Sequence, residues 1–431
     1  MQHGQIDLLA PPFKGHLHPI LAMGRLLAPD YDICVFSSAS AQADIEAAGL
    51  KGIILESVDD KVLMDIVSPP YVVGNSPLAL RKQFRGVLPF LQKLSQELEE
   101  IYSTRRPDLM IADFVIPVAG LVADRFNIPW WTSIPPVCVL ECPDGPPAYL
   151  GGLQPATSPL GELRNFLGRK LVRVFKRVIF RCYAKEIKAL GLQQVYRKDG
   201  SEAIYSSRRI LCLSHQGLEF THNWPPQVSL IGPMLYSPPT SSLQPDFLAG
   251  KKYILVTLGT HVDAQKDRVC AAVEQVVEKF PDYVFHFTDG HSETQSMRKI
   301  NEQLYRFSYI NYQEHIASYD LVVHHAGTGI LYHCLLNGIP SLAYPVDYDQ
   351  FDYAARLEHH GFSVWLKDIS NLDKALATAL ASEEMKCRVK EFAGTLRDTV
   401  DAGEFLELVR EHMSSSATEI HDLSGIPRGK I

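Results

Sequence analysis

The segment of this sequence best suited to binding an anion is HHAGTG, residues 324–329. It follows an apolar run, 319–323, that predicts a buried strand, and it precedes residues 330–337, which predict a helix. Glycines let backbone N–H groups approach a ligand closely, and a helix N-terminus favours negative charge. A histidine at the end of the strand adds a donor that can carry positive charge. The segment predicts a site for an anion such as a diphosphate.

Asp349 and Gln350 follow this segment and offer a different chemistry. A carboxylate accepts hydrogen bonds and a carboxamide both donates and accepts them, which is what sugar hydroxyls require. The alternative is that both residues face solvent and that Asp349 only caps a helix over 351–359. Taken in order with the anion site, the pair predicts binding of a nucleotide-diphosphate sugar.

Length and composition narrow the class of protein. A chain of 431 residues is long enough for two ordinary domains, and 46% hydrophobic with 21% charged residues is typical of a globular protein. A formal net charge of −7 argues against a nucleic-acid binder, which needs a basic surface. The eight cysteines form no CxxC pair, and no second cluster joins Cys138 and Cys142, so no metal site is expected.

The start of the sequence does not resemble a signal peptide, because the apolar run 6–10 stops at Pro11-Pro12. No uninterrupted apolar run approaches the ~20 residues of a membrane span. We therefore expect a cytoplasmic protein with reduced cysteines.

Short apolar runs alternate with helical patterns along the chain, which predicts parallel sheets covered by helices. Strands are expected at 6–10, 32–37, 52–56, 109–112, 253–258 and 283–288, and helices at 19–27, 39–48, 118–126 and 268–280. The Pro/Ser-rich stretch around 236–250 predicts a linker. We expect an α/β protein with Rossmann-like domains at 1–235 and 251–413, facing each other across a cleft, and a flexible tail at 414–431.

One segment departs from this alternation. Between residues 163 and 190, apolar residues recur at helical spacing while nine Lys and Arg side chains occupy the other positions. A basic amphipathic helix of this kind can contact an anionic membrane surface or an acidic partner. The alternative is the solvated face of a helix that packs on its own domain.

Several motifs, in this order, resemble the GT-B glycosyltransferases of the family that includes UDP-glycosyltransferases and antibiotic (macrolide-type) glycosyltransferases. The resemblance covers nearly the whole chain. The motifs are PPFKGH at 11–16 with Pro19, IADF at 111–114, LIGP at 230–233, VTLGT at 256–260, and the segment 324–350 described above.

The resemblance implies a role for residues of both halves. His16 falls on the family's general base and Asp113 on the carboxylate that orients it, while His18 ranks well below His16 as the base. The remaining matched positions bind the donor. They are Thr260 and His325 with Gly327, Thr328 and Gly329 at the diphosphate, Gln313 near the base, and Asp349 with Gln350 at the hexose.

Three positions depart from the family pattern. Ile310 stands where an aromatic residue often stacks on uracil, and Ile330 replaces a hydroxyl residue at the phosphates. His333 replaces the glutamate that usually holds the ribose hydroxyls. A UDP-hexose is favoured as the donor, and a dTDP-sugar remains open.

The resemblance implies inverting transfer of a hexose to a small, largely hydrophobic hydroxylated acceptor, such as a natural product, without a metal or other cofactor. The acceptor pocket is expected in segments 65–90 and 135–190, where an aromatic and apolar lining would favour a flat, hydrophobic aglycone. The candidate lining residues are Pro69, Pro70, Tyr71, Phe84, Trp130, Trp131, Pro135, Pro136 and Tyr149. A nucleotide-sugar epimerase of the same fold and a non-catalytic nucleotide-sugar-binding protein are the alternatives. A nicotinamide dehydrogenase is disfavoured because no GxGxxG follows the first strand. The oligomeric state is left open.

Overall fold

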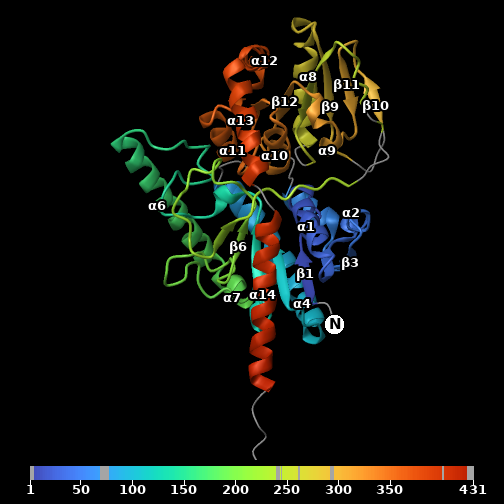
Figure 1. The fold of residues 1–431 in the computed structure, drawn as a ribbon. Helices are drawn as coiled ribbons and strands as arrows, with labels where there is room; N and C mark the ends of the chain where they lie inside the picture. Colours follow the sequence, from blue (N-terminus) through green and yellow to red (C-terminus); the bar gives the residue numbers. More distant parts are fainter. Residues whose placement is uncertain are drawn as a thin grey trace, which may run out of the picture.

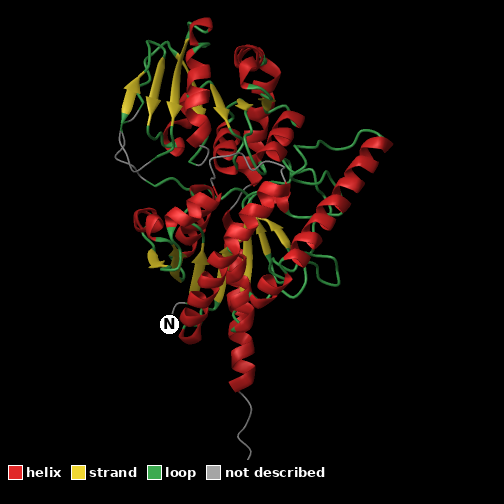
Figure 2. Cartoon of the chain, turned by 180° about the vertical axis from the view of Figure 1, so that it is seen from behind, coloured by secondary structure: helices red, strands yellow, loops and turns green. Residues whose placement is uncertain are grey.

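The protein is described by a computed structural model that covers residues 4–67, 77–238, 243, 245–260, 263–291, 296–399 and 402–424. Two α/β units lie one above the other, the N-terminal unit below and the C-terminal unit above in Figure 1. Each unit is built around a sheet with helices on its faces, as Figure 2 shows from behind. The fold class expected from the sequence is confirmed.

The sheet of the N-terminal unit is parallel throughout its described strands. Its central strands are buried on both faces, which explains their continuous apolar sequences. The strand order is β3 (Lys51–Ile54), β2 (Asp32–Ser37), β1 (Gln5–Leu9), β4 (Leu109–Asp113), β5 (Trp130–Ile134), β6 (Ile210–Cys212) and β7 (Val228–Leu230). The helices are α1 (Lys14–Leu27), α2 (Gln42–Ala47), α3 (Asp60–Val67), α4 (Pro77–Thr104), α5 (Pro117–Arg125), α6 (Pro159–Cys182) and α7 (Ala184–Ala189).

The C-terminal unit repeats this plan, with one antiparallel pair at the β10 edge. Its strand order is β10 (Met297–Lys299), β11 (Leu304–Phe307), β9 (Tyr283–Thr288), β8 (Lys252–Thr257), β12 (Leu321–His324), β13 (Ser341–Ala343) and β14 (Ser363–Trp365). Its helices are α8 (Asp263–Glu274), α9 (Tyr312–His315), α10 (Thr328–Asn337), α11 (Gln350–His359), α12 (Leu372–Ala381) and α13 (Glu383–Thr399). In both sheets the carboxyl ends of parallel strands form one edge, where such folds bind ligands.

The last helix, α14 (Ala402–Ser424), leaves the C-terminal unit and runs down along the N-terminal unit (Figure 1). Phe405 and Val409 are fully buried there against Leu17 and Ile20 of α1. Residues 414–424 of the expected tail are helical, because the helix continues from the packed segment as far as Ser424. Residues 425–431 lie outside the described part of the chain, as does part of the linker expected at 236–250.

Most expected elements lie within a few residues of the observed ones, but α1 and α8 both begin five residues before the expected start. A helix was expected from Pro19, since proline lacks the N–H that continues a helix. The observed helix begins at Lys14 and contains Pro19. The carbonyl of Phe13 accepts hydrogen bonds from the N–H groups of His16 and Leu17, at 2.8 and 2.7 Å, which closes the first turn. His16 thus lies on the first turn of a helix.

Candidate active site

His16 and Asp113 meet at the carboxyl edge of the N-terminal sheet. Nδ1 of His16 lies 3.1 Å from both carboxylate oxygens of Asp113, which ends β4 and is fully buried at its side chain. The N–H of Val115 donates to Asp113 Oδ1 at 3.0 Å and fixes the carboxylate. With Nδ1 directed at Asp113, the other ring nitrogen of His16, Nε2, is the one that can take a proton from a ligand.

The charges around His16 tune its basicity. Burial lowers the pKa of His16, but the charge and hydrogen bond of Asp113 and the charge of Asp349 outweigh it, so the pKa is raised above its usual value. Asp349 belongs to the C-terminal unit. The proposed base and the proposed sugar-binding carboxylate are therefore close enough to interact across the two units.

His18, the competing histidine, also lines the cavity but pairs with a different carboxylate. Its Nε2 lies 3.5 Å from Asp44 Oδ2 of α2, and its ring packs edge-on against Tyr236. Burial lowers the pKa of His18 despite the contact with Asp44. The structure therefore gives His16, and not His18, the buried carboxylate partner that a general base needs.

The imidazole of His325 lies between two glycines. A Cβ atom added to Gly327 would lie 2.3 Å from His325 Nε2, and one added to Gly259 would lie 2.8 Å from Cε1. Gly259 also has a φ of 71°, which side-chain-bearing residues rarely adopt. Only glycine leaves room for the ring at both positions, so the backbone determines where His325 points.

The N-terminus of α10 lies next to the imidazole of His325. Gly327 is the N-cap residue, and Thr328 and Gly329 form the first turn. Together with Thr260, all three line a cavity between the two units. Free N–H groups at the start of a helix attract negative charge. His324, one residue before His325, is fully buried, and burial together with His325 lowers its pKa to about 3, so this imidazole is neutral.

Asp349 and Gln350 lie at the start of α11 and line the cavity. Asp349 occupies the N-cap position, but its side chain makes no capping hydrogen bond, which disfavours a purely structural role. Burial raises the pKa of Asp349, opposed by a backbone hydrogen bond and by the charges of His16 and Arg356. Oε1 of Gln350 accepts from the N–H groups of Val346 and Asp347, at 2.8 and 3.0 Å. The amide NH₂ of Gln350 is then the group it can offer to a sugar.

One residue expected at the nucleotide base is not in the cavity. Gln313 lies on α9, is exposed, and does not line the cavity. Tyr309 and Tyr312 do, and the hydroxyl of Tyr312 is within 2.7 Å of Thr257 Oγ1. The sequence offered no pattern that singled out these tyrosines.

The three departures from the family pattern have different surroundings. Ile310 is buried in the core of the C-terminal unit and does not line the cavity. Ile330 and His333 do line it. Burial, with a smaller effect of His18, lowers the pKa of His333 to about 4, so a neutral imidazole stands where the family has a carboxylate.

The cavity between the units has a volume of about 1000 Å³. Its N-terminal wall is mainly apolar and includes Leu55, Met64, Phe90, Leu91, Leu94 and Phe114. Of the aromatic and proline residues expected around an acceptor, Pro135, Pro136 and Tyr149 line it. Trp130 and Trp131 are buried in β5, and Phe84 packs against Tyr183. Pro69, Pro70 and Tyr71 lie outside the described residues.

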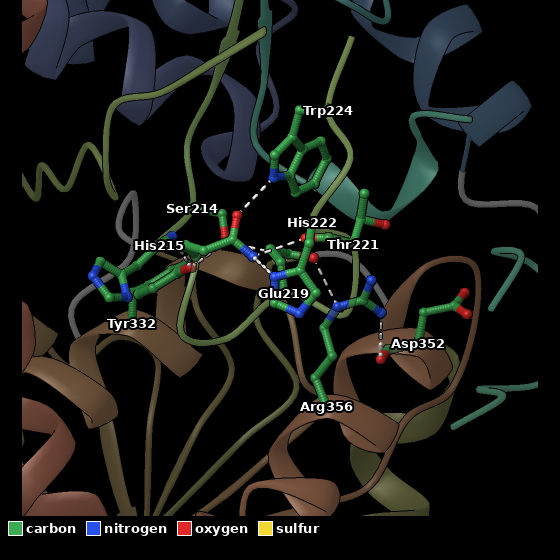
Figure 3. Close-up of polar contacts among 10 residues, drawn as sticks. Ser214, His215, Glu219, Thr221, His222, Trp224, Tyr332, Asp352 and Arg356 are labelled. Carbon is green, nitrogen blue, oxygen red and sulfur yellow. Dashed lines mark hydrogen bonds and ion pairs between the residues drawn. The ribbon is translucent and has the colours of Figure 1, made fainter. Parts of the chain in front are cut away.

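A buried polar network joins the two units beside this cavity (Figure 3). Nε of Arg356, on α11, donates to Glu219 Oε2 at 2.9 Å, and both side chains are almost fully buried. Ser214 donates to Glu219 Oε1 at 2.7 Å and lies 2.6 Å from the hydroxyl of Tyr332, on α10. The loop that carries Ser214 and Glu219 therefore holds the two helices whose N-terminal ends face the cavity. Sequence reasoning missed this network.

In the part of the chain that the structure describes, no helix combines the length and apolar character needed to cross a membrane. Among the same residues, no three His, Cys, Asp or Glu side chains gather as a metal site would require. All eight cysteines lie in the described ranges and are free.

Comparison with known proteins identifies the class of enzyme. Residues 253–395 match the glycosyltransferase family 28 C-terminal domain. The chain is also 20% identical to NDP-glycosyltransferase YjiC of Bacillus subtilis, over 97% of this chain and 99% of that protein. The chain is a glycosyltransferase of the GT-B type. The resemblance noted in the sequence is thereby confirmed.

Solved structures support the fold of this glycosyltransferase. The glycotransferase of kitacinnamycin has a TM-score of 0.71 at 18% identity, with 96% of this chain and 100% of that chain covered. The spinosyn rhamnosyltransferase SpnG, solved with thymidine diphosphate, has a TM-score of 0.62 at 15% identity, with 94% and 100% covered. At these identities the likeness establishes the GT-B fold.

Proposed function

We propose that this glycosyltransferase moves a hexose from a nucleotide-diphosphate sugar, a UDP-hexose or alternatively a dTDP-sugar, to a small, largely hydrophobic hydroxylated acceptor, with inversion at the anomeric carbon. One observation carries the proposal. A histidine paired with a buried carboxylate and a second carboxylate from the other unit face one cavity. The relative YjiC, an NDP-glycosyltransferase, and SpnG, solved with thymidine diphosphate, support this class of donor.

The first step assigned to the protein is proton removal from the acceptor. Nε2 of His16 takes the hydroxyl proton, and Asp113 stabilises the imidazolium that forms. The acceptor oxygen attacks the anomeric carbon from the side opposite the diphosphate. The bond between that carbon and the diphosphate oxygen breaks, and the leaving group keeps the electron pair. In-line attack of this kind inverts the configuration.

The second task is to stabilise the leaving diphosphate. His325, Thr260 and the N–H groups at the start of α10 meet its developing charge, so we propose that no metal ion is needed. Asp349 and the amide NH₂ of Gln350 hold the hexose hydroxyls. The apolar N-terminal wall of the cavity suits a flat, hydrophobic aglycone such as a polyketide, flavonoid or terpenoid.

The decisive experiment compares His16→Ala with His18→Ala. A panel of aglycones with UDP-glucose and dTDP-sugars identifies a productive pair, and NMR of the product gives its anomeric configuration. Loss of the base is expected to reduce kcat by roughly 10²–10⁴-fold while the affinity for the free nucleotide stays unchanged. His18→Ala should retain most activity, and EDTA should not inhibit. Full activity of His16→Ala would refute the assignment, and conversion of donor alone would indicate an epimerase.

A further inference from the structure

Helix α6 carries a continuous apolar stripe on its solvent side. Ser158 caps the helix by accepting from the N–H of Gly161 at 3.2 Å, and Pro159 follows at the first helical position. The apolar residues recur every three or four positions and therefore share one face. They are Leu160, Leu163, Leu167, Leu171, Val174 and Val178, with exposed fractions between 46% and 79%.

Ion pairs, the close approach of Gly168 and the packing of Phe180 on the core, and not this stripe, hold α6 to the N-terminal unit. Gly168 is buried against the N-terminal unit. Lys176 pairs with Glu202 at 2.5 Å and with Glu141 at 2.7 Å, and Arg173 pairs with Glu141 at 3.1 Å. Figures 1 and 2 show α6 at the outer margin of the molecule in both views. The apolar stripe is thus directed outward, while the helix itself packs on the N-terminal unit through Gly168 and Phe180.

Basic side chains flank the stripe. Lys170, Arg177 and Arg181 are exposed and, at spacings of seven and four residues, fall on one side of it. Lys170 Nζ lies 5.3 Å from the ring centre of Phe166, so this charge lies next to an aromatic side chain of the same helix. Within a chain of net charge −7, α6 contains seven basic residues and one acidic residue. Positive charge is therefore concentrated on this helix.

We propose that α6 docks this glycosyltransferase on the surface of an anionic lipid bilayer. The apolar stripe would enter the boundary between headgroups and acyl chains, and the flanking Lys and Arg side chains would meet lipid phosphates. Charge complementarity selects this occupant. A second copy of the chain placed helix against helix would bring Lys170, Arg177 and Arg181 close to their own counterparts, where like charges repel.

The test is co-sedimentation of the full-length protein with vesicles. One vesicle population contains phosphatidylcholine alone, and the other contains phosphatidylcholine mixed with phosphatidylglycerol. Binding is expected to the mixed vesicles only. It should weaken as NaCl is raised, because salt screens the attraction between exposed charges.

Three matched variants assign the binding to α6. Lys170→Gln/Arg177→Gln/Arg181→Gln removes the flanking charge, and each lost charge should weaken vesicle binding by roughly fivefold. Leu163→Gln/Leu167→Gln/Leu171→Gln removes part of the stripe and should also reduce binding by more than about tenfold. The control removes three exposed basic residues of the C-terminal unit, Arg298→Gln/Lys374→Gln/Arg388→Gln, and should bind like the wild type.

Circular dichroism and nucleotide binding show that each variant is folded, and neither depends on a membrane. The proposal is overturned if the wild type ignores anionic vesicles, or if the control variant loses as much binding as the α6 variants. It is also overturned if sedimentation velocity shows a dimer that the leucine variant converts to a monomer, since a second copy would then cover the stripe.

Discussion

At the scale of single residues, the basicity of His16 sets the expected pH dependence. The pKa of His16 is raised by Asp113 and Asp349 against the effect of burial, and only the neutral imidazole accepts a proton. Turnover should therefore rise with pH as His16 loses its proton, with an inflection above the ordinary histidine value of ~6.5. Asp113→Asn removes the main effect that raises the pKa and leaves burial to lower it.

The Asp113→Asn variant should therefore move this inflection to lower pH and reduce kcat, since the imidazolium loses its partner. The measurement is a kcat/KM profile for both proteins, with nucleotide affinity as the control. An inflection that stays in place would show that another group controls the rate.

Variants of Asp349 and Gln350 can distinguish a role of these side chains in sugar binding from a role in holding the structure of their loop. Asp349→Ala should lower transfer strongly, by about tenfold to a hundredfold, because a buried sugar hydroxyl loses an acceptor. Nucleotide affinity and the urea midpoint should change little, since Asp349 makes no capping bond. A loss of ~1 kcal/mol in unfolding free energy with unchanged selectivity for the hexose would instead support a cap.

Gln350→Glu keeps the oxygen that accepts from Val346 and Asp347 but removes the NH₂ group. We expect this variant to retain the fold and lose transfer. Gln350→Ala should lose both the loop contacts and transfer. Comparison of the two in steady-state kinetics and thermal unfolding shows which function of the carboxamide matters.

The sequence was most informative about residues whose chemistry needs a fixed local pattern. His16, Thr260, His325 and the pair Asp349–Gln350 were placed by motifs, and the structure brings them to one cavity. Gln313 was placed by the same reasoning, yet it is exposed on α9. The direction of a side chain on a helix of four residues depends on how that helix packs, which a motif does not encode.

At the scale of elements, the two glycines around His325 are expected to act by leaving space for its imidazole ring. Gly327→Ala would place a methyl group 2.3 Å from His325 Nε2, so the ring must move. Loss of one charged hydrogen bond to a diphosphate should weaken nucleotide binding by roughly tenfold to a hundredfold. Isothermal titration calorimetry with UDP and dTDP measures this loss.

Gly329 provides the matched control in the same turn of α10. A Cβ atom there meets nothing within 4 Å, so Gly329→Ala should bind nucleotide normally. Alanine also favours a helix over glycine, and the variant should be more stable by up to about 1 kcal/mol. Equal loss of affinity in both variants would show that flexibility of the turn, and not the position of His325, is what the glycines provide.

Regular elements were predictable where burial imposes a simple pattern. β2 and β9 were expected at the residues where they occur, because a strand buried on both faces reads as a continuous apolar run. No helix is expected over the residues of α14, and its serines with the following Gly and Pro residues resemble a tail. The helix packs through Phe405 and Val409, which lie upstream of the serines, and it continues from there to Ser424.

At the scale of the whole molecule, the contacts between the two units determine whether His16 keeps its position relative to the donor site. These contacts were invisible in the sequence, because Glu219 and Arg356 are 137 residues apart and belong to no motif. Apolar packing supports them, since Leu218 of the N-terminal unit shares a buried cluster with Leu331 and Tyr353 of the C-terminal unit. The N-terminal unit thereby holds α10 and α11 in place.

The last prediction concerns Arg356. Arg356→Met leaves the buried carboxylate of Glu219 without its cation, and breaking one side of a buried ion pair typically destabilises a protein by ~3–5 kcal/mol. Because α11 begins at Gln350, kcat should fall as the sugar site loosens against His16, while nucleotide affinity changes less. Glu219→Gln/Arg356→Met removes the uncompensated charge and keeps an acceptor for Ser214, so it should recover most of the stability.

Urea unfolding and steady-state kinetics of the two single variants and the double variant give the coupling between Glu219 and Arg356. Arg388→Met, which removes the exposed partner of Glu384, is the matched control and should change stability by less than about 1 kcal/mol. If Arg356→Met behaves like this surface control, the pair does not hold the units together. If the double variant recovers stability but not kcat, the ion pair itself, and not the fold alone, sets the position of the donor site relative to His16.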